Sequence, residues 1–464
     1  MHKCLIGLVS LLLCFQGVMA GGKNPNRPNI IFILVDDLGW ADLATYGNSI
    51  HETPNIDRLA ASGMTFTDAY ASAPICSASR ASLLTGKSPA RLGFEFVTKP
   101  DDSDVPEGTL LRQPRYPRDL PLSEKTIAEQ ISPTYVCGYF GKWHLTQEND
   151  RYLGWGNMFG PFQQGFRVGA EHRGSHSYGY SPAEKGTFSN LASGTFPVDS
   201  VTELSIRFLE QHRDAPFMLY YSMYYVHAPV KTRSKWLYDK YREKLGSAAS
   251  EELIHYAAFI ETMDHYIGQL LQAVEQLKLG ENTLIVFTSD NGGDPRFSKS
   301  ESLRGGKWTL YEAGIRIPTI VCWKNVIKAG AISRIPINGY DWYPTIAELT
   351  GVPNLPKCTI DGQSIVPVLL GKGQSTTDKN RILYWHFPFY HPPVVNSKPQ
   401  SAIRMGKYKA IYFYEEDRIE LYDLDTDSAE QHDISRAEPA QASTMKKLLF
   451  DKLDLVHARM PVKN

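Results

Sequence analysis

One cysteine lies in a short polar segment where its side chain could attack an anionic group. Cys76 lies between Pro74 and Arg80 among small side chains, and the stretch that follows, as far as Gly86, can form a helix. Cys76 would then sit at the positive, amino-terminal end of that helix. The segment predicts a nucleophile that reacts with an anion. The alternative is an inert buried cysteine, which is the commoner fate of a lone cysteine.

Oxygen-rich side chains follow two apolar runs that are predicted to be buried strands. Asp36 and Asp37 follow the run from Asn29 to Val35, and Asp290 and Asn291 follow a second run. Sites in α/β proteins form at the carboxyl ends of strands. Three carboxylates and one amide at that edge would make an oxygen site for Ca²⁺ or Mg²⁺. Taken alone, each pair is more often a turn or a helix cap.

The pattern of apolar residues predicts an α/β fold. Continuous apolar runs indicate strands that are covered on both faces, and amphipathic segments between them indicate helices. Strands are expected at Asn29–Val35, Phe217–Tyr225, Thr283–Thr288 and Ile315–Trp323, and helices from Pro54 to Gly63 and at Ser123–Ile131, Asp199–His212 and Ser250–Leu277. This alternation predicts a large sheet sandwiched by helices.

The predicted pattern of secondary structure changes after about Cys358, where short strands and turns replace the long strands and helices. We therefore expect a catalytic domain over residues 28–357 and an α+β subdomain over residues 358–464, built from a small antiparallel sheet and a terminal helix. The expected strands are Ile382–His386, Ser401–Met405, Lys407–Tyr414 and Ile419–Leu424, and the expected helix is Glu438–His457.

The charge balance argues against nucleic acid as a partner. The 464 residues include 49 basic and 50 acidic side chains, which leaves a formal net charge of −1. Nucleic-acid binders need a broad basic face, and this composition does not supply one. Apolar residues make up 42% of the chain, which is enough for a sizeable core and excludes a disordered protein.

The first twenty residues predict a signal peptide. Lys3 precedes an apolar stretch over residues 5–15 that is too short to span a bilayer, and cleavage is expected before Gly21. The protein is therefore expected to be exported, either periplasmic or secreted, with no transmembrane segment. The chain has six cysteines, of which Cys4 and Cys14 would leave with the signal, and it has no Asn-x-Ser/Thr sequon. The four remaining cysteines are widely spaced and form no disulfide framework, and the absence of a sequon favours a bacterial envelope or medium.

Several blocks extend the pattern around Cys76 along the chain. Together they resemble the sulfatase family of the alkaline phosphatase-like superfamily, whose signature is Cys-x-Pro/Ala-x-Arg followed by Leu-Leu-Thr-Gly. Ala78 stands where proline is more usual, and Ala313 replaces a usual glycine. The matching blocks are Cys76–Gly86, Gly141–Leu145, His227–Pro229, Ser289–Gly292, Gly306–Pro318 and Glu420–Leu424. The resemblance implies a large mixed, mostly parallel sheet.

The resemblance also implies that Cys76 is converted to formylglycine, an aldehyde, by a maturation enzyme. One hydroxyl of the hydrated aldehyde would attack sulfur and displace the substrate alcohol. The second hydroxyl would then lose its proton, and sulfate would leave as the aldehyde reforms. This route avoids a second attack on sulfur.

One divalent cation is implied as well, expected to be Ca²⁺, with Mg²⁺ as the alternative. The ligands would be Asp36, Asp37, Asp290, Asn291 and the modified Cys76. The cation would polarise a sulfate oxygen and lower the pKa of the attacking hydroxyl. Asp290 is in addition a candidate base for that hydroxyl.

The remaining polar residues of the blocks take their roles from the same resemblance. Arg80 would hold the formylglycine hydroxyl. Lys142 and Lys307 would neutralise sulfate oxygens as charge builds. His144 would take the proton in the elimination step, and His227 would contact sulfate and protonate the leaving oxygen.

A glycine- and tyrosine-rich loop offers weaker candidates for substrate binding. His172, Arg173 and His176 lie in this loop and could bind a sugar hydroxyl or a second sulfate. An ordinary solvated loop is at least as good an interpretation. The same holds for His386 and His391 in the smaller subdomain.

These features favour a sulfuric ester hydrolase that acts on a sulfated polysaccharide or oligosaccharide. The first alternative is a phosphate or phosphonate monoester hydrolase of the same superfamily. The second is a catalytically inactive carbohydrate-binding homologue, against which the intact set of Cys76, Arg80, Lys142, Asp290 and Lys307 speaks. The sequence does not indicate an oligomeric state.

Overall fold

The computed structural model describes most of the chain that follows the expected signal peptide. The described residues are 27–98, 108–147, 153–298, 302–352, 360–371, 381–394 and 397–464. The predicted signal peptide, Cys358 and the predicted boundary between residues 357 and 358 lie outside these ranges. Within them, no helix combines the length and the apolar character needed to cross a membrane.

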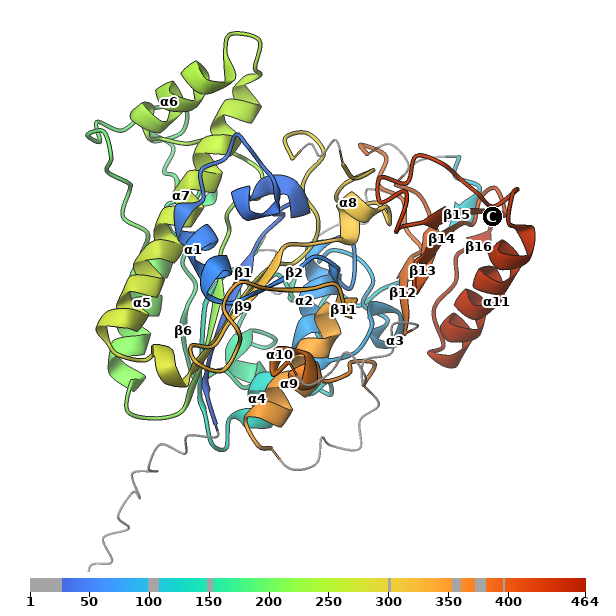
Figure 1. Cartoon of the computed structure of the whole chain (residues 1–464), viewed down its shortest axis with the longest axis horizontal. Helices are drawn as coiled ribbons and strands as arrows, with labels where there is room; N and C mark the ends of the chain where they lie inside the picture. Colours follow the sequence, from blue (N-terminus) through green and yellow to red (C-terminus); the bar gives the residue numbers. More distant parts are fainter. Residues whose placement is uncertain are drawn as a thin grey trace, which may run out of the picture.

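A mixed sheet of eight strands forms the centre of the molecule (Figure 1), in the order β10-β2-β9-β8-β1-β7-β5-β6. The run from β8 to β6 is parallel, whereas β9 is antiparallel to both of its neighbours. The fold class predicted from the sequence is thereby confirmed. The strands are β1 Asn29–Val35, β2 Met64–Phe66, β5 Val136–Gly141, β6 Val168–Ala170, β7 Phe217–Ser222, β8 Thr283–Ser289, β9 Thr319–Cys322 and β10 Ala331–Ser333.

Helices cover both faces of this sheet and bury a separate apolar core on each side. One face carries α1 (Pro54–Ser62), α5 (Ser200–His212) and the long α7 (Glu251–Gln276), against which α6 (Lys235–Leu245) packs. The other face carries α2 (Cys76–Thr85), α4 (Ile127–Ile131), α9 (Trp342–Leu349) and α10 (Val366–Leu369). Because both faces are covered, the central strands are apolar throughout.

Two predicted strands are shorter in the structure because the chain turns at polar contacts. β7 ends at Ser222, where the following residues fold back so that the amide of Val226 donates to the carbonyl of Asp36 at 2.7 Å. The run from Ile315 to Trp323 contains only β9, since Ile315 ends the short helix α8 (Glu312–Ile315) and Pro318 cannot donate to a ladder. Neither turn is visible in the apolar pattern.

The predicted helix at Ser123–Ile131 also starts later than expected. Thr126 caps α4 by accepting the amide of Glu129, whose side chain accepts the amide of Thr126 in return. This reciprocal capping box fixes the start of the helix at Ile127.

A second sheet, of four antiparallel strands, lies beside the first (Figure 1). One of its faces packs against α11 (Pro439–Leu455), and the other contacts residues of the α2 segment such as Ile75 and Ala78. The predicted antiparallel sheet with a terminal helix is confirmed. Its strands are β12 Ile382–Phe387, β13 Gln400–Met405, β14 Tyr408–Phe413 and β15 Arg418–Asp423.

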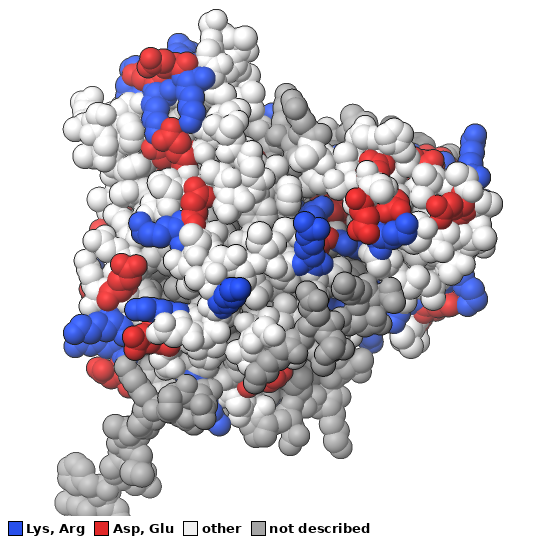
Figure 2. Space-filling model, viewed as in Figure 1, with Lys and Arg blue, Asp and Glu red and all other residues white. Residues whose placement is uncertain are grey.

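Short elements complete the described part of the chain. They are α3 (Pro89–Leu92), the strand pair β3 (Ala69–Tyr70) and β11 (Ile337–Asn338), and the pair β4 (Leu111–Arg112) and β16 (Val462–Lys463). On the face shown in Figure 2, the described basic and acidic side chains lie in small mixed clusters. That distribution agrees with the near-zero net charge of the sequence.

A buried ion cluster ties the second sheet to α8. Lys409, on β14, lies 2.8 Å from Glu312 and 2.9 Å from Glu430, and all three side chains are buried. Burial raises the pKa of Glu430, although the charge of Lys409 opposes this. The lysine therefore compensates two carboxylates that would otherwise be buried together.

Replacing Lys409 should destabilise the fold strongly. Lys409→Met removes the cation that Glu312 and Glu430 share and leaves Glu312 only its longer ion pair with Arg316. We expect the free energy of unfolding to fall by about 3–5 kcal/mol. Lys407→Met is the control, because Lys407 pairs with Asp423 on the surface, and we expect no measurable change. Denaturant unfolding of both variants gives the comparison. An equal decrease in the free energy of unfolding in both variants would show that the buried cluster stabilises the fold no more than the surface ion pair does.

Candidate active site

The pairing of two parallel strands brings the oxygen-rich side chains together. Val35 of β1 lies opposite Ser289 of β8, so the residues that follow the two strands are neighbours. The amide of Asp37 donates to Asp290 Oδ1 at 3.1 Å, and Asn291 Nδ2 donates to Asp37 Oδ1 at 2.8 Å. Asp37 has a left-handed backbone with φ of 62°, which is uncommon outside glycine and occurs often at functional sites.

Cys76 is the first residue of α2, and its side chain faces this cluster. Its Sγ lies 3.6 Å from Asp37 Oδ1, and the residue is buried. Burial raises the pKa of the thiol well above its ordinary value, although the positive charges of Lys142 and Lys307 oppose the rise. An unmodified Cys76 is therefore a neutral thiol at neutral pH and a weak nucleophile.

Arg80 lies one turn further along α2 and joins three elements. Its Nε donates to Asp290 Oδ2 at 2.8 Å, and its Nη1 donates to the carbonyl of Lys142 at 2.9 Å and to Ser222 Oγ at 2.6 Å. The Ser222 hydroxyl donates in turn to the carbonyl of Lys142 at 2.7 Å. The guanidinium thus fixes the ends of β5, β7 and β8 relative to Cys76.

Two lysines pair with the aspartates that follow β1. Lys142 Nζ lies 2.6 Å from Asp36 Oδ2, and Lys307 Nζ lies 2.6 Å from Asp37 Oδ2. Burial would raise the pKa of Asp37, but Lys307, His227 and Lys142 lower it overall. Gly141 precedes Lys142 with φ of +101°, and a Cβ there would lie 1.9 Å from the carbonyl oxygen of Ser222. Only glycine allows this approach.

The two candidate histidines make different contacts, and the Nε2 of His144 lies 3.0 Å from the carbonyl of Thr98. His227 Nε2 lies 3.5 Å from Asp37 Oδ2, while its Nδ1 contacts Tyr178 Oη at 3.0 Å and the Ala228 carbonyl at 2.5 Å. Burial, followed by Lys307, lowers the pKa of His227 to about 3. Burial also lowers the pKa of His144 well below its usual range, with Lys142 as the next cause. Both rings are neutral at neutral pH.

The geometry of this cluster fits a cation. Ligand atoms of Asp36, Asp37, Cys76 and His227 all lie within 4.8 Å of one another. Asp36 Oδ1 and Asn291 Oδ1 are buried and accept no hydrogen bond from the described residues. Buried acceptors without a partner are rare and are explained by a water or an ion. His227 is a group that the sequence did not propose as a ligand.

The three candidate residues in the glycine-rich loop differ in their burial. His172 is exposed, whereas Arg173 is partly buried and donates to the carbonyl of Tyr178 at 3.3 Å. His176 is fully buried, with Nε2 at 2.8 Å from the carbonyl of His227. The expectation that His176 binds substrate is wrong, because its ring has no accessible surface and supports the segment that carries His227.

The two candidate histidines of the C-terminal part, His386 and His391, contact other side chains or the backbone of the protein. His386 is buried, with Nδ1 at 2.7 Å from Ser401 Oγ and Nε2 at 3.0 Å from the carbonyl of Arg459. His391 stacks on Trp308, with a distance of 3.7 Å between ring centroids. His391 is therefore close to the loop of Lys307, whereas His386 is a core residue.

Ser222 and Tyr178 were missed by sequence reasoning. Both are single hydroxyl residues outside any block, Ser222 at the end of a buried strand and Tyr178 in a loop rich in tyrosine. The position of Ser222 at the carboxyl end of β7, next to β1, is a signal that could have found it. Nothing comparable distinguishes Tyr178 from its neighbours in the sequence.

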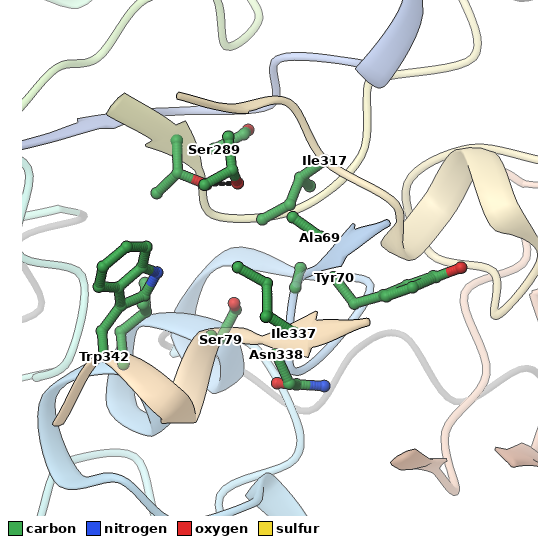
Figure 3. A pocket seen from close by; sticks show the side chains of 13 residues that line it. Ala69, Tyr70, Ser79, Ser289, Ile317, Ile337, Asn338 and Trp342 are labelled. Atoms are coloured by element: carbon green, nitrogen blue, oxygen red, sulfur yellow. Dashed lines mark hydrogen bonds between the residues drawn. The ribbon is translucent and has the colours of Figure 1, made fainter. Parts of the chain in front are cut away.

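A small cavity lies behind α2 and is not the substrate site. Its volume is about 10 Å³, room for a single water, and Figure 3 shows Ser79 and Ile337 on one side with Ser289 opposite. The Ser79 hydroxyl is buried there with no partner among the described residues. A substrate must therefore approach Cys76 from elsewhere.

Known proteins match this chain over most of its length. The family described as Sulfatase matches residues 28–352, and the C-terminal region of N-sulphoglucosamine sulphohydrolase matches residues 306–458. Human arylsulfatase A is 33% identical over 437 residues, which cover 87% of this chain and 78% of that protein. N-acetylgalactosamine-6-sulfatase of Canis lupus familiaris is 30% identical over 432 residues, with coverages of 87% and 75%.

A solved structure shares the fold. The structure of Ps i-CgsB in complex with k-i-k-neocarrahexaose has a TM-score of 0.74 and 26% identity, and the match covers 92% of this chain and 93% of that one. With the family match and the relatives above, this defines the class of protein. The chain belongs to the sulfatase family of the alkaline phosphatase-like superfamily. It is a sulfuric ester hydrolase.

Removing the Ser222 hydroxyl should lower kcat by more than the accompanying loss of stability can explain. Ser222→Ala leaves an N–H of the buried Arg80 without an acceptor, which costs about 1–3 kcal/mol and lets the guanidinium shift. We expect kcat for 4-nitrophenyl sulfate to fall about tenfold with a smaller change in KM. Ser205→Ala is the matched control, since this buried serine bonds only to its own helix. A uniform loss in both variants would make Ser222 merely structural.

Proposed function

We propose that this protein is an exported sulfatase that removes sulfate from a sulfated polysaccharide or oligosaccharide. The observation that carries the proposal is the convergence of Cys76, Lys142 and Lys307 on Asp36 and Asp37. The relative named N-acetylgalactosamine-6-sulfatase and the structure of Ps i-CgsB in complex with k-i-k-neocarrahexaose support a carbohydrate as the substrate. The expected signal peptide supports export.

We propose Asp36, Asp37, Asp290 and Asn291 as the holders of one divalent cation, with Cys76 in its modified form beside them. An oxygen-rich ligand set favours Ca²⁺ or Mg²⁺, and we propose Ca²⁺. When bound, the cation supplies Lewis-acid polarisation of a sulfate oxygen. The unpartnered oxygens of Asp36 and Asn291 support this assignment.

Cys76 is proposed to act as formylglycine, after conversion by a maturation enzyme. Its place at the first residue of a helix favours an anion in front of it. Arg80, one turn later, holds the helix against β8 through Asp290 and so keeps the reacting position fixed.

The basic side chains around Cys76 divide the remaining work. Lys142 and Lys307 present two ammonium groups that bind sulfate oxygens and balance charge as the ester bond breaks. His227 is proposed to contact sulfate and to protonate the leaving oxygen. Because its Nδ1 donates to the carbonyl of Ala228, the neutral ring must first take up a proton on Nε2, the atom that faces Asp37. His144, neutral as well, accepts the proton of the elimination step. The neutral His144 is thus in the protonation state that its role needs, whereas His227 must be protonated before it can donate.

Activity tests the proposal through Cys76. The wild-type protein, produced with a maturation enzyme, should release sulfate from at least one class of defined sulfated oligosaccharide, and Cys76→Ala should lose roughly a thousandfold or more while remaining folded. Mass spectrometry of the Cys76 peptide should show the aldehyde. Cys322→Ala is the control and should keep its activity, because this buried cysteine lies in β9. Faster cleavage of matched phosphate esters, or sulfate release by Cys76→Ala, would contradict the proposal.

Calcium should stabilise the protein through the aspartates. At a hundredfold excess over Kd, bound Ca²⁺ contributes about 2.7 kcal/mol to stability, so the melting temperature should rise when Ca²⁺ is added after chelation. Asp36→Asn should remove most of this rise. Asp264→Asn is the control, because this buried carboxylate caps α1 and should leave the calcium response intact. Calorimetry with and without Ca²⁺ measures the difference, and an unchanged response in Asp36→Asn would exclude this ligand set.

A further inference from the structure

A pocket of about 520 Å³ lies where the loop after β8 faces a loop of the C-terminal part. This volume is in the range that small-molecule ligands occupy. Figure 1 shows α8, which follows the Lys307 loop, between the central sheet and the second sheet. The side chains that give the pocket its character are Arg296, Arg304, Tyr311, His391, Pro393 and Val394.

The walls of this pocket belong to the same loops that carry the reacting groups. The amide of Lys307 donates to the carbonyl of Gly293 at 2.9 Å, which joins the loop of Asn291 to the loop of Lys307. The amide of Trp308 donates to the carbonyl of Pro74, two residues before Cys76, at 2.9 Å. His391, in the pocket wall, stacks on Trp308. The pocket is therefore next to the reaction centre.

Two arginines, Arg296 and Arg304, outnumber the one carboxylate that lines this pocket, Asp294, so its net charge is positive. Arg296 is exposed and is held by Asp294, to which its Nε donates at 2.9 Å and its Nη2 at 2.6 Å. Its Nη1 has no hydrogen-bond partner among the residues that the structure describes. Arg304 lies over the ring of Tyr311, 4.1 Å from the centroid. Its Nη1 bonds to Tyr422 and to the carbonyl of Glu430, while its Nε and Nη2 have no partner among the described residues.

We propose that this pocket binds a second anionic group, a sulfate or a carboxylate, on a sugar adjacent to the one whose ester is cleaved. The proposal rests on the carbohydrate sulfatase function proposed above. Arginine presents its N–H groups as a planar fork that matches the oxygens of sulfate and carboxylate. Pro393 and Val394 supply apolar surface for the sugar ring. The preferred substrate is therefore a carbohydrate with at least two anionic groups.

The electrostatics of Arg296 agree with this placement. Its hydrogen bonds to Asp294 raise its pKa, burial opposes the rise, and the charges of Asp37 and Tyr178 add to it. The charge of Arg296 is thus within range of both Asp37, in the reaction centre, and Tyr178, which contacts His227.

Inhibition of 4-nitrophenyl sulfate hydrolysis tests the proposal with defined disaccharides. The probes are matched sets in which one member carries a single sulfate, another carries a second sulfate on the neighbouring sugar, and a third carries a uronic carboxylate there. In the wild type we expect Ki to be about tenfold lower for at least one doubly charged member than for the singly charged member. Comparison of the two doubly charged members shows whether sulfate or carboxylate is preferred.

Substitution of Arg296 decides whether this pocket is the cause. In Arg296→Ala the Ki ratio should fall to near one, and Arg296→Lys should restore part of it because a positive charge returns. Arg213→Ala is the matched control, since Arg213 is also exposed beside an aspartate, Asp214, and its ratio should equal that of the wild type. A ratio near one in the wild type, or an unchanged ratio in Arg296→Ala, overturns the proposal.

The same measurements separate this proposal from the proposed function. If wild-type protein that carries the aldehyde does not hydrolyse 4-nitrophenyl sulfate, the sulfatase mechanism itself is refuted. Normal hydrolysis without any preference for the second charge would refute the pocket alone. Arg304→Lys extends the test, because lysine keeps the charge but loses the fork, and we expect an intermediate ratio in this variant.

Discussion

The structure depends on burying six charged side chains side by side. Carboxylates and cations are equal in number, so each charge has a partner where water does not reach. An unpaired charge at this depth would cost several kcal/mol, which forces the strand ends and the α2 helix into one arrangement. The six residues are Asp36, Asp37 and Asp290, with Arg80, Lys142 and Lys307. The backbone conforms to this arrangement, as the left-handed Asp37 shows.

A balanced cluster of this kind is prepared for both a cation and an anionic ester. Addition of a dication and a sulfate monoester, which carries one negative charge, changes the total charge of the site by a single unit. Lys142 and Lys307 each hold one carboxylate oxygen in the structure. With those oxygens satisfied by a cation, both ammonium groups become available for sulfate. Arg80 keeps its contacts with the carbonyl of Lys142 and with Ser222 in either state, because neither group is proposed to bind the cation or the substrate.

The sequence predicted the buried strands well, because a run such as Asn29–Val35 has few other stable environments. It predicted their ends less well, since β7 stops at Ser222 through backbone contacts with a distant strand. The site residues came from long blocks whose order is specific. Isolated polar residues such as Ser222 could not be predicted as site residues, because the local sequence does not distinguish a hydroxyl that contacts Arg80 from a hydroxyl on the surface. His176 failed for the same reason, since its burial is a property of the tertiary fold.

The second sheet follows from the same electrostatic logic and explains where specificity can reside. The charged centre tolerates little change, so differences between substrates must be read by the loops around it. Lys409 anchors the sheet to Glu312 in α8, which follows the loop of Lys307. The loop with His391 is thereby held against Trp308, one residue from a reacting group. A substrate group bound between these loops is fixed relative to Cys76 by a buried ion pair, so recognition by the second sheet can be transmitted to the position of the ester.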